Sequence, residues 1–109
     1  MWAPTVDIWE TRDNLVLTFE IPGIREKDVT VSITGDLLTV KGGRRFDRDV
    51  MDESNHRHER VYGKFERSIQ LPMAVQPDEV RALYRDGVLE VTLPKAEEVK
   101  PKEIKIDVL

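Results

Sequence analysis

The chain has no cysteine among its 109 residues, which excludes disulfide bonds and thiol chemistry and is typical of a cytoplasmic protein. Aromatic residues make up only 6% of the chain, and no apolar run approaches the length of a membrane span. A secretory signal, with basic residues followed by an apolar stretch, is also missing from the start. We therefore expect a cytoplasmic protein that makes no contact with membranes.

Neither sign of charge dominates, because 17 basic and 21 acidic residues leave a net charge of −4. This balance argues against nucleic-acid binding as the main activity, since the phosphate backbone selects strongly basic surfaces. Charged residues amount to 35% and hydrophobic residues to 39% of the chain. The length and composition together are typical of one domain with a modest core.

Short runs of alternating apolar and polar residues predict β-strands and no helix of ten residues or more. The clearest runs cover residues 15–21, 29–33, 38–40, 65–71 and 88–93, with weaker candidates at 5–10 and 80–84. Turn-forming residues separate these runs, and the pair Asp86-Gly87 predicts a hairpin between the last two. About seven short strands predict an all-β protein, a two-sheet antiparallel immunoglobulin-like β-sandwich.

One long stretch, residues 41–60, interrupts the strand pattern. It holds six basic residues, five acidic residues and two histidines, and its large apolar residues are Phe46, Val50 and Met51. Connections of this length inside a small domain are often functional. The stretch is therefore either a solvated loop or an arm that reaches a partner through these three apolar side chains.

The C-terminal end carries two isoleucines, Ile104 and Ile106, after a polar tether at residues 95–102. In an extended segment their side chains share one side, about 7 Å apart. A groove or sheet edge, on this subunit or on another copy, would bury them. The alternative is that they belong to a last strand of the chain's own sheet.

Five segments together resemble a known family. They are 4–10 (PTVDIWE), 19–24 (FEIPGI) with 28–31 (DVTV), 62–72 (YGKFERSIQLP), 82–89 (ALYRDGVL) and 104–106 (IKI). In this order they resemble small heat-shock proteins of the alpha-crystallin type, in their bacterial or archaeal form. Asp86 stands where the family usually has asparagine. The family's N-terminal arm is missing before the first strand, so we expect weaker assembly and weaker chaperone strength.

The resemblance implies an ATP-independent holdase that binds partly unfolded client proteins and prevents their aggregation. Binding of this kind depends on apolar burial and needs no cofactor. The resemblance divides the chain into a sandwich domain at residues 1–94, with a dimerisation loop at 41–61, and a C-terminal extension at 95–109. A p23-like co-chaperone domain is the alternative, but such domains lack the long arm and the Ile-x-Ile tail.

Two binding surfaces follow from the resemblance. A homodimer would form by strand exchange between the arm and the first strand, and its interface would contain Thr5, Val6, Ile8, Trp9, Phe46, Val50, Met51 and Arg67. Higher oligomers would form through the tail. The receiving groove is expected at Val29, Val31, Ile33, Val80 and Leu83.

Two of these residues allow a second interpretation. Arg67 shares a strand face with apolar residues, and it either pairs at the dimer interface or extends to water. Trp9 has the opposite parity to Ile8, so it either packs in the core or contacts a partner or client.

No pattern supports a metal site or an enzyme. His56 and His58 stand in a charged stretch of a chain without cysteine, which is weak evidence for a metal. Asp47, Asp49 and Asp52 lack the glycine that a calcium loop requires. The serines have no partners typical of a catalytic triad, and no glycine-rich phosphate loop is present. We expect no catalytic residues and no cofactor.

Overall fold

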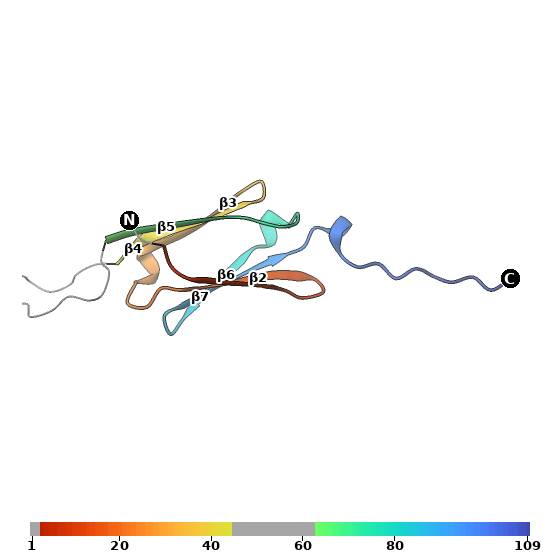
Figure 1. The fold of residues 1–109 in the computed structure, drawn as a ribbon, viewed down its shortest axis with the longest axis horizontal. Coiled ribbons are helices and arrows are strands. Elements are labelled where there is room, and N and C mark those ends of the chain that lie inside the picture. The colour runs from red at the N-terminus through yellow and green to blue at the C-terminus, as the bar shows by residue number, and fades with distance from the viewer. Residues whose placement is uncertain (1–2, 45–62) are drawn as a thin grey trace, which may run out of the picture.

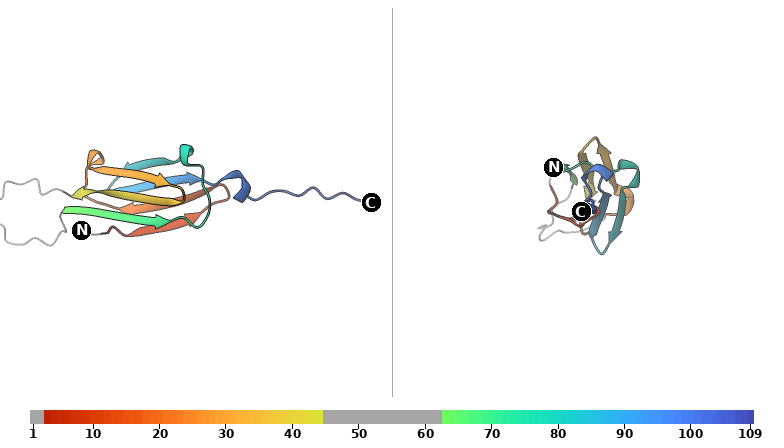
Figure 2. Two further views of the ribbon diagram at one scale, coloured as in Figure 1. Left: turned by 90° about the horizontal axis from the view of Figure 1, so that it is seen from above. Right: turned by 90° about the vertical axis from the view of Figure 1, so that its right-hand side faces the viewer.

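The computed structural model describes residues 3–44 and 63–109, which fold into two antiparallel β-sheets packed face to face (Figures 1 and 2). One sheet has the order β1-β2-β7-β6, formed by β1 (Val6–Glu10), β2 (Asn14–Glu20), β7 (Val88–Pro94) and β6 (Arg81–Arg85). The other has the order β3-β4-β5, formed by β3 (Val29–Thr34), β4 (Leu37–Arg44) and β5 (Gly63–Gln70). The predicted all-β sandwich is confirmed.

The core lies between the sheets and is built from alternate residues of the central strands. Strands β2 and β7 pair in a register that sets Leu17 opposite Val91 and Phe19 opposite Leu89, so these side chains share the inner face. Leu38, Val40 and Phe65 of the other sheet complete the core. All of these side chains are at most 4% exposed. The period-two pattern in the sequence therefore corresponds to the inner faces of both sheets.

The predicted hairpin between β6 and β7 turns at Asp86 and Gly87. Both residues have positive φ, at 54° and 79°, as a two-residue type I′ turn requires. The turn also packs closely against the body, because a Cβ at Gly87 would lie 3.0 Å from the Cα of Pro22. The Gly87 carbonyl accepts a hydrogen bond from the Ile21 amide at 2.8 Å.

Three short 3-10 helices accompany the strands: η1 (Glu26–Asp28) before β3, η2 (Pro77–Glu79) before β6, and η3 (Glu97–Val99) after β7. Each has three residues, too few for a hydrophobic period, so the sequence pattern did not reveal them. Among the described residues, no helix is long and apolar enough to cross a bilayer.

The C-terminal tail, residues 101–109, forms no strand, so the alternative of a last strand in the chain's own sheet is wrong for this structure. All nine residues are exposed. The tail projects far beyond the sandwich, and the described chain has principal extents of 83 × 22 × 18 Å (Figure 1).

Candidate functional site

A groove with many apolar residues lies between the edge strands β3 and β6, which belong to different sheets. It consists of two adjoining hollows of about 300 and about 250 Å³ that share Val31 and Ala82. The first hollow is also lined by Ile21, Glu26, Val29, Tyr84 and Leu89, and the second by Ser32, Ile33, Leu38, Pro77 and Val80. We call the two hollows together the β3–β6 groove.

The alternation of both strands explains why the groove is apolar. On β3, Val29, Val31 and Ile33 are half-buried, whereas the intervening Thr30 and Ser32 are exposed. On β6, Ala82 lies opposite the buried Val91 and Tyr84 opposite the buried Leu89, so both point toward the other sheet. Because β3 and β6 are the edges of their sheets, the space between them opens to solvent.

The structure brings together four of the five residues predicted for the groove, and Leu83 is the exception. Leu83 pairs with the exposed Glu90 on the outer face of its sheet and is 58% exposed. Val80 and Leu83 are three residues apart, and side chains at an odd separation on an extended chain point to opposite faces. Ala82 takes the position that was predicted for Leu83.

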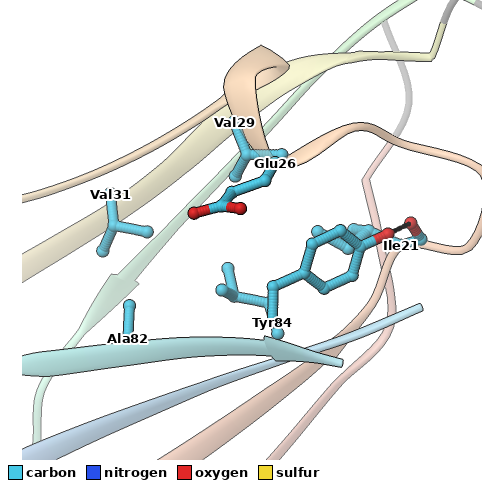
Figure 3. A pocket seen from close by; sticks show the side chains of 7 residues that line it. Ile21, Glu26, Val29, Val31, Ala82 and Tyr84 are labelled. Atoms are coloured by element: carbon cyan, nitrogen blue, oxygen red, sulfur yellow. Dashed lines mark hydrogen bonds between the residues drawn. The ribbon is translucent and has the colours of Figure 1, made fainter. Parts of the chain in front are cut away.

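Tyr84 closes the first hollow by linking β6 to the loop after β2. Its hydroxyl donates a hydrogen bond to the Ile24 carbonyl at 2.6 Å and also lies 3.1 Å from the Ile21 carbonyl. Figure 3 shows the tyrosine ring lying along the wall of the hollow. The bond holds the Pro22-Gly23 turn against β6, which no motif in the sequence predicted.

Glu26 is the only charged residue among those that line the two hollows. It stands on η1, immediately before β3. Its carboxylate points over the first hollow, toward the space between Val31 and Tyr84 (Figure 3). The lining of the β3–β6 groove thus carries a single acidic group, at the η1 end.

The opposite edges of the sandwich, β1 and β5, contain four of the residues predicted for the dimer interface: Val6, Ile8, Trp9 and Arg67. Val6 and Ile8 pair with Phe19 and Leu17 and therefore face the other sheet. Trp9 pairs with Val16 and lies on the outer face, so it is not part of the core. Ile8 is 46% and Trp9 45% exposed, which leaves apolar surface open along this edge.

Arg67 connects the two sheets at this same edge. It shares the inner face of β5 with Phe65 and Ile69, as predicted, and is half-buried. Its Nη1 donates a hydrogen bond to the carbonyl of Pro4 at 3.3 Å. The guanidinium therefore has a backbone partner just before β1, where Thr5 is exposed.

Several predicted residues lie outside the described part of the chain. They are the arm residues Phe46, Val50 and Met51, and the histidines and aspartates that were considered as metal ligands. Among the described residues, no group of three His, Cys, Asp or Glu side chains could hold a metal ion.

The tail leaves the body beside η2 through a set of buried contacts. Lys95 is 6% exposed, and its Nζ forms an ion pair with Glu10 Oε2 at 2.7 Å. The Ala96 amide donates to the Ala74 carbonyl at 3.0 Å. On η3, a hydrogen bond from Lys100 to Glu97 at 2.9 Å raises the pKa of Lys100. Beyond this anchor, Ile104 and Ile106 are 87% and 84% exposed.

The chain belongs to the Hsp20/alpha crystallin family, whose pattern matches residues 7–109. It is 37% identical to small heat shock protein C2 of Rickettsia felis, over 94% of this chain and 67% of that one. It is 38% identical to spore protein SP21 of Stigmatella aurantiaca, over 96% of this chain and 62% of that one. The chain thus spans about two thirds of the length of these relatives.

Solved structures agree with this assignment. The fold is similar to that of heat shock protein 16.0 from Schizosaccharomyces pombe, with a TM-score of 0.85 and 29% identity over 100% of this chain and 98% of that one. It is also similar to a small heat-shock protein from Xylella fastidiosa, with a TM-score of 0.80 and 34% identity over 98% of both chains. These likenesses support a chaperone role, and they favour neither an enzyme nor the p23-like alternative.

Proposed function

We propose that this protein is an ATP-independent holdase, which binds partly unfolded proteins in the cytoplasm and keeps them from aggregating. The observation that carries the proposal is the apolar surface left open at both edges of a small heat-shock protein sandwich. At one edge it is the β3–β6 groove, and at the other it is β1 with Ile8 and Trp9. Unfolding proteins expose apolar side chains, and burying these against such surfaces is favourable without an energy source.

The groove also suits the tail of this family member. Two adjoining hollows share a wall at Val31 and Ala82, and two isoleucines at i and i+2 project about 7 Å apart from an extended chain. Burial of each isoleucine would contribute about 1.5–3 kcal/mol before the cost of ordering the tail. Docking of Ile104 and Ile106 would be reversible, and in a second subunit it would link dimers into larger assemblies.

The dimer would form at the opposite edge. Strand β1 is the outermost strand of its sheet, and its free edge would attract another strand. We propose that residues 46–52 of a second copy add there, beside residues 5–9. Such pairing would cover part of Ile8 and Trp9, and it would bring the partner's arm close to Arg67.

A direct test is to heat a thermally labile enzyme with and without this protein, in the absence of ATP, and follow light scattering. We expect slower growth of scattering as the protein is raised to several-fold excess. An unrelated β-sandwich protein at the same concentration is the control. Unchanged scattering would contradict the holdase proposal, and suppression that required ATP would indicate another class of chaperone.

A further inference from the structure

The two ends of the β3–β6 groove differ in charge. Glu26 lines the hollow near η1, whereas no charged residue lines the hollow near η2. The described residues contain no ion-pair partner for the Glu26 carboxylate, which points over the first hollow (Figure 3). A segment with a basic group on one side of its apolar pair would therefore bind in one direction rather than the other.

The tail has this asymmetry. In an extended segment alternate side chains share a face, so the face with the two isoleucines consists of Lys102, Ile104, Ile106 and Val108. The opposite face consists of Glu103, Lys105, Asp107 and Leu109. The face that would enter the groove thus starts with an ammonium group and ends with an apolar side chain next to the terminal carboxylate.

We propose that Glu26 sets the direction of the docked tail by pairing with Lys102, so that the tail runs from η1 toward η2. This inference rests on the tail docking proposed above. Ile104 then occupies the first hollow and Ile106 the second. The reverse direction would bring Asp107 and the C-terminal carboxylate toward Glu26, where like charges repel.

Acidic residues at the other end do not offset this preference. Asp78 and Glu79 belong to η2 and are exposed, as Glu26 is, but neither lines the second hollow. Glu26, in contrast, lines the first hollow itself. The Glu26 end is therefore the better site for the ammonium group of Lys102.

The direction has a structural consequence: with η3 folded, the occupant is the tail of a second copy. The Ala96 amide holds the start of η3 on the body through the Ala74 carbonyl, and the bonds of Lys100 stay within η3. Beyond a folded η3, the two residues that lead to Lys102 reach only about 7 Å. The tail leaves at the η2 end, as Figure 1 shows, and the four residue steps from Val80 to Tyr84 already span about 13 Å. With η3 folded, the chain's own Lys102 therefore does not reach Glu26 at the far end of the groove.

The direction can be measured with a spin-labelled peptide. The receiver is the full chain with Ile104→Gly and Ile106→Gly, which frees its groove from resident tails, and the peptide covers residues 100–109. A nitroxide on a cysteine added to either peptide end stays there, because the chain has no thiol to exchange with. We expect the N-terminal label to broaden the Val29 amide signal more than that of Ile33, and the C-terminal label to do the opposite.

The three outcomes separate the two proposals. The reversed pattern of broadening would overturn the role of Glu26 and leave tail docking intact. Labels that broaden neither amide would overturn tail docking and this inference with it. The expected pattern supports both.

Charge reversal then tests the pair itself. A Lys102→Glu peptide should bind about two- to five-fold more weakly, as expected for an exposed ion pair, and a Glu26→Lys receiver should restore its binding. A Lys105→Glu peptide is the matched control, because it has the same net charge but places the change on the face away from the groove. Equal weakening by both peptides, or no rescue by Glu26→Lys, would overturn the pairing.

Discussion

The substitution Gly42→Ala tests how the groove rim is held in place. Gly42 lies on β4 opposite Val29, and an added Cβ would stand 2.2 Å from the Asp28 carbonyl oxygen and 3.0 Å from Cε1 of Phe65. The first of these contacts is with backbone, so η1 would have to move. Because η1 carries Glu26 over the groove, the strain would reach the docking site as well as the core.

The expected cost follows from the geometry. Adding a methyl group to a filled site typically costs about 1–3 kcal/mol. Alanine also reduces the conformational entropy of the unfolded chain, which offsets about 0.4–1 kcal/mol of this destabilisation. For a domain of this size, each kcal/mol lost from the free energy of unfolding lowers the melting temperature by about 4–8 °C.

Gly43→Ala is the matched control, since the nearest atom to its added Cβ is 3.8 Å away, at ordinary contact distance. Both variants should be unfolded by heat and by urea at one protein concentration, because association with another copy also stabilises the fold. We expect Gly42→Ala to melt well below Gly43→Ala. Equal stability of the two variants would show that β4 and η1 are not packed as closely as the structure indicates.

Three further predictions concern the tail, the dimer and the tail anchor. Replacing Ile104 and Ile106 with glycine should shift higher oligomers toward dimers in analytical ultracentrifugation while the far-UV circular dichroism stays unchanged; loss of the fold would refute the linking role. Deleting residues 48–56 should give monomers by size-exclusion chromatography, and an intact dimer would contradict strand exchange. Glu10→Gln should destabilise the protein more than Lys95→Met in urea unfolding, because it leaves a buried ammonium group without its carboxylate; the opposite order would count against this ion pair.

The strands were predictable because their signal is local. Alternation over three to seven residues placed a predicted run in each of the seven described strands, and Asp86-Gly87 identified the hairpin turn between β6 and β7. The three 3-10 helices gave no such signal. Glu26 was therefore missed as part of the site, because in the sequence it is one of several charged residues in a turn.

Side-chain direction and burial were harder to predict where an element begins or ends. Leu83 was placed in the groove together with Val80, although side chains three residues apart on an extended chain point to opposite faces. Alternation through the observed β6 puts Ala82 and Tyr84 inward. Lys95 stands in a stretch that reads as a polar tether, yet it is buried against the body. Its partner Glu10 is 85 positions earlier in the chain, and such a pairing depends on the tertiary fold rather than on local pattern.

The central claim is that this protein holds unfolding clients in complexes that stay in solution. The most direct measurement is to heat a labile enzyme with the protein, without ATP, and to separate the supernatant by size-exclusion chromatography. We predict that enzyme and protein elute together in a species larger than either alone, and that the share of enzyme in it grows with the amount of protein. Enzyme found entirely in the pellet, with the protein eluting unchanged, would contradict the claim.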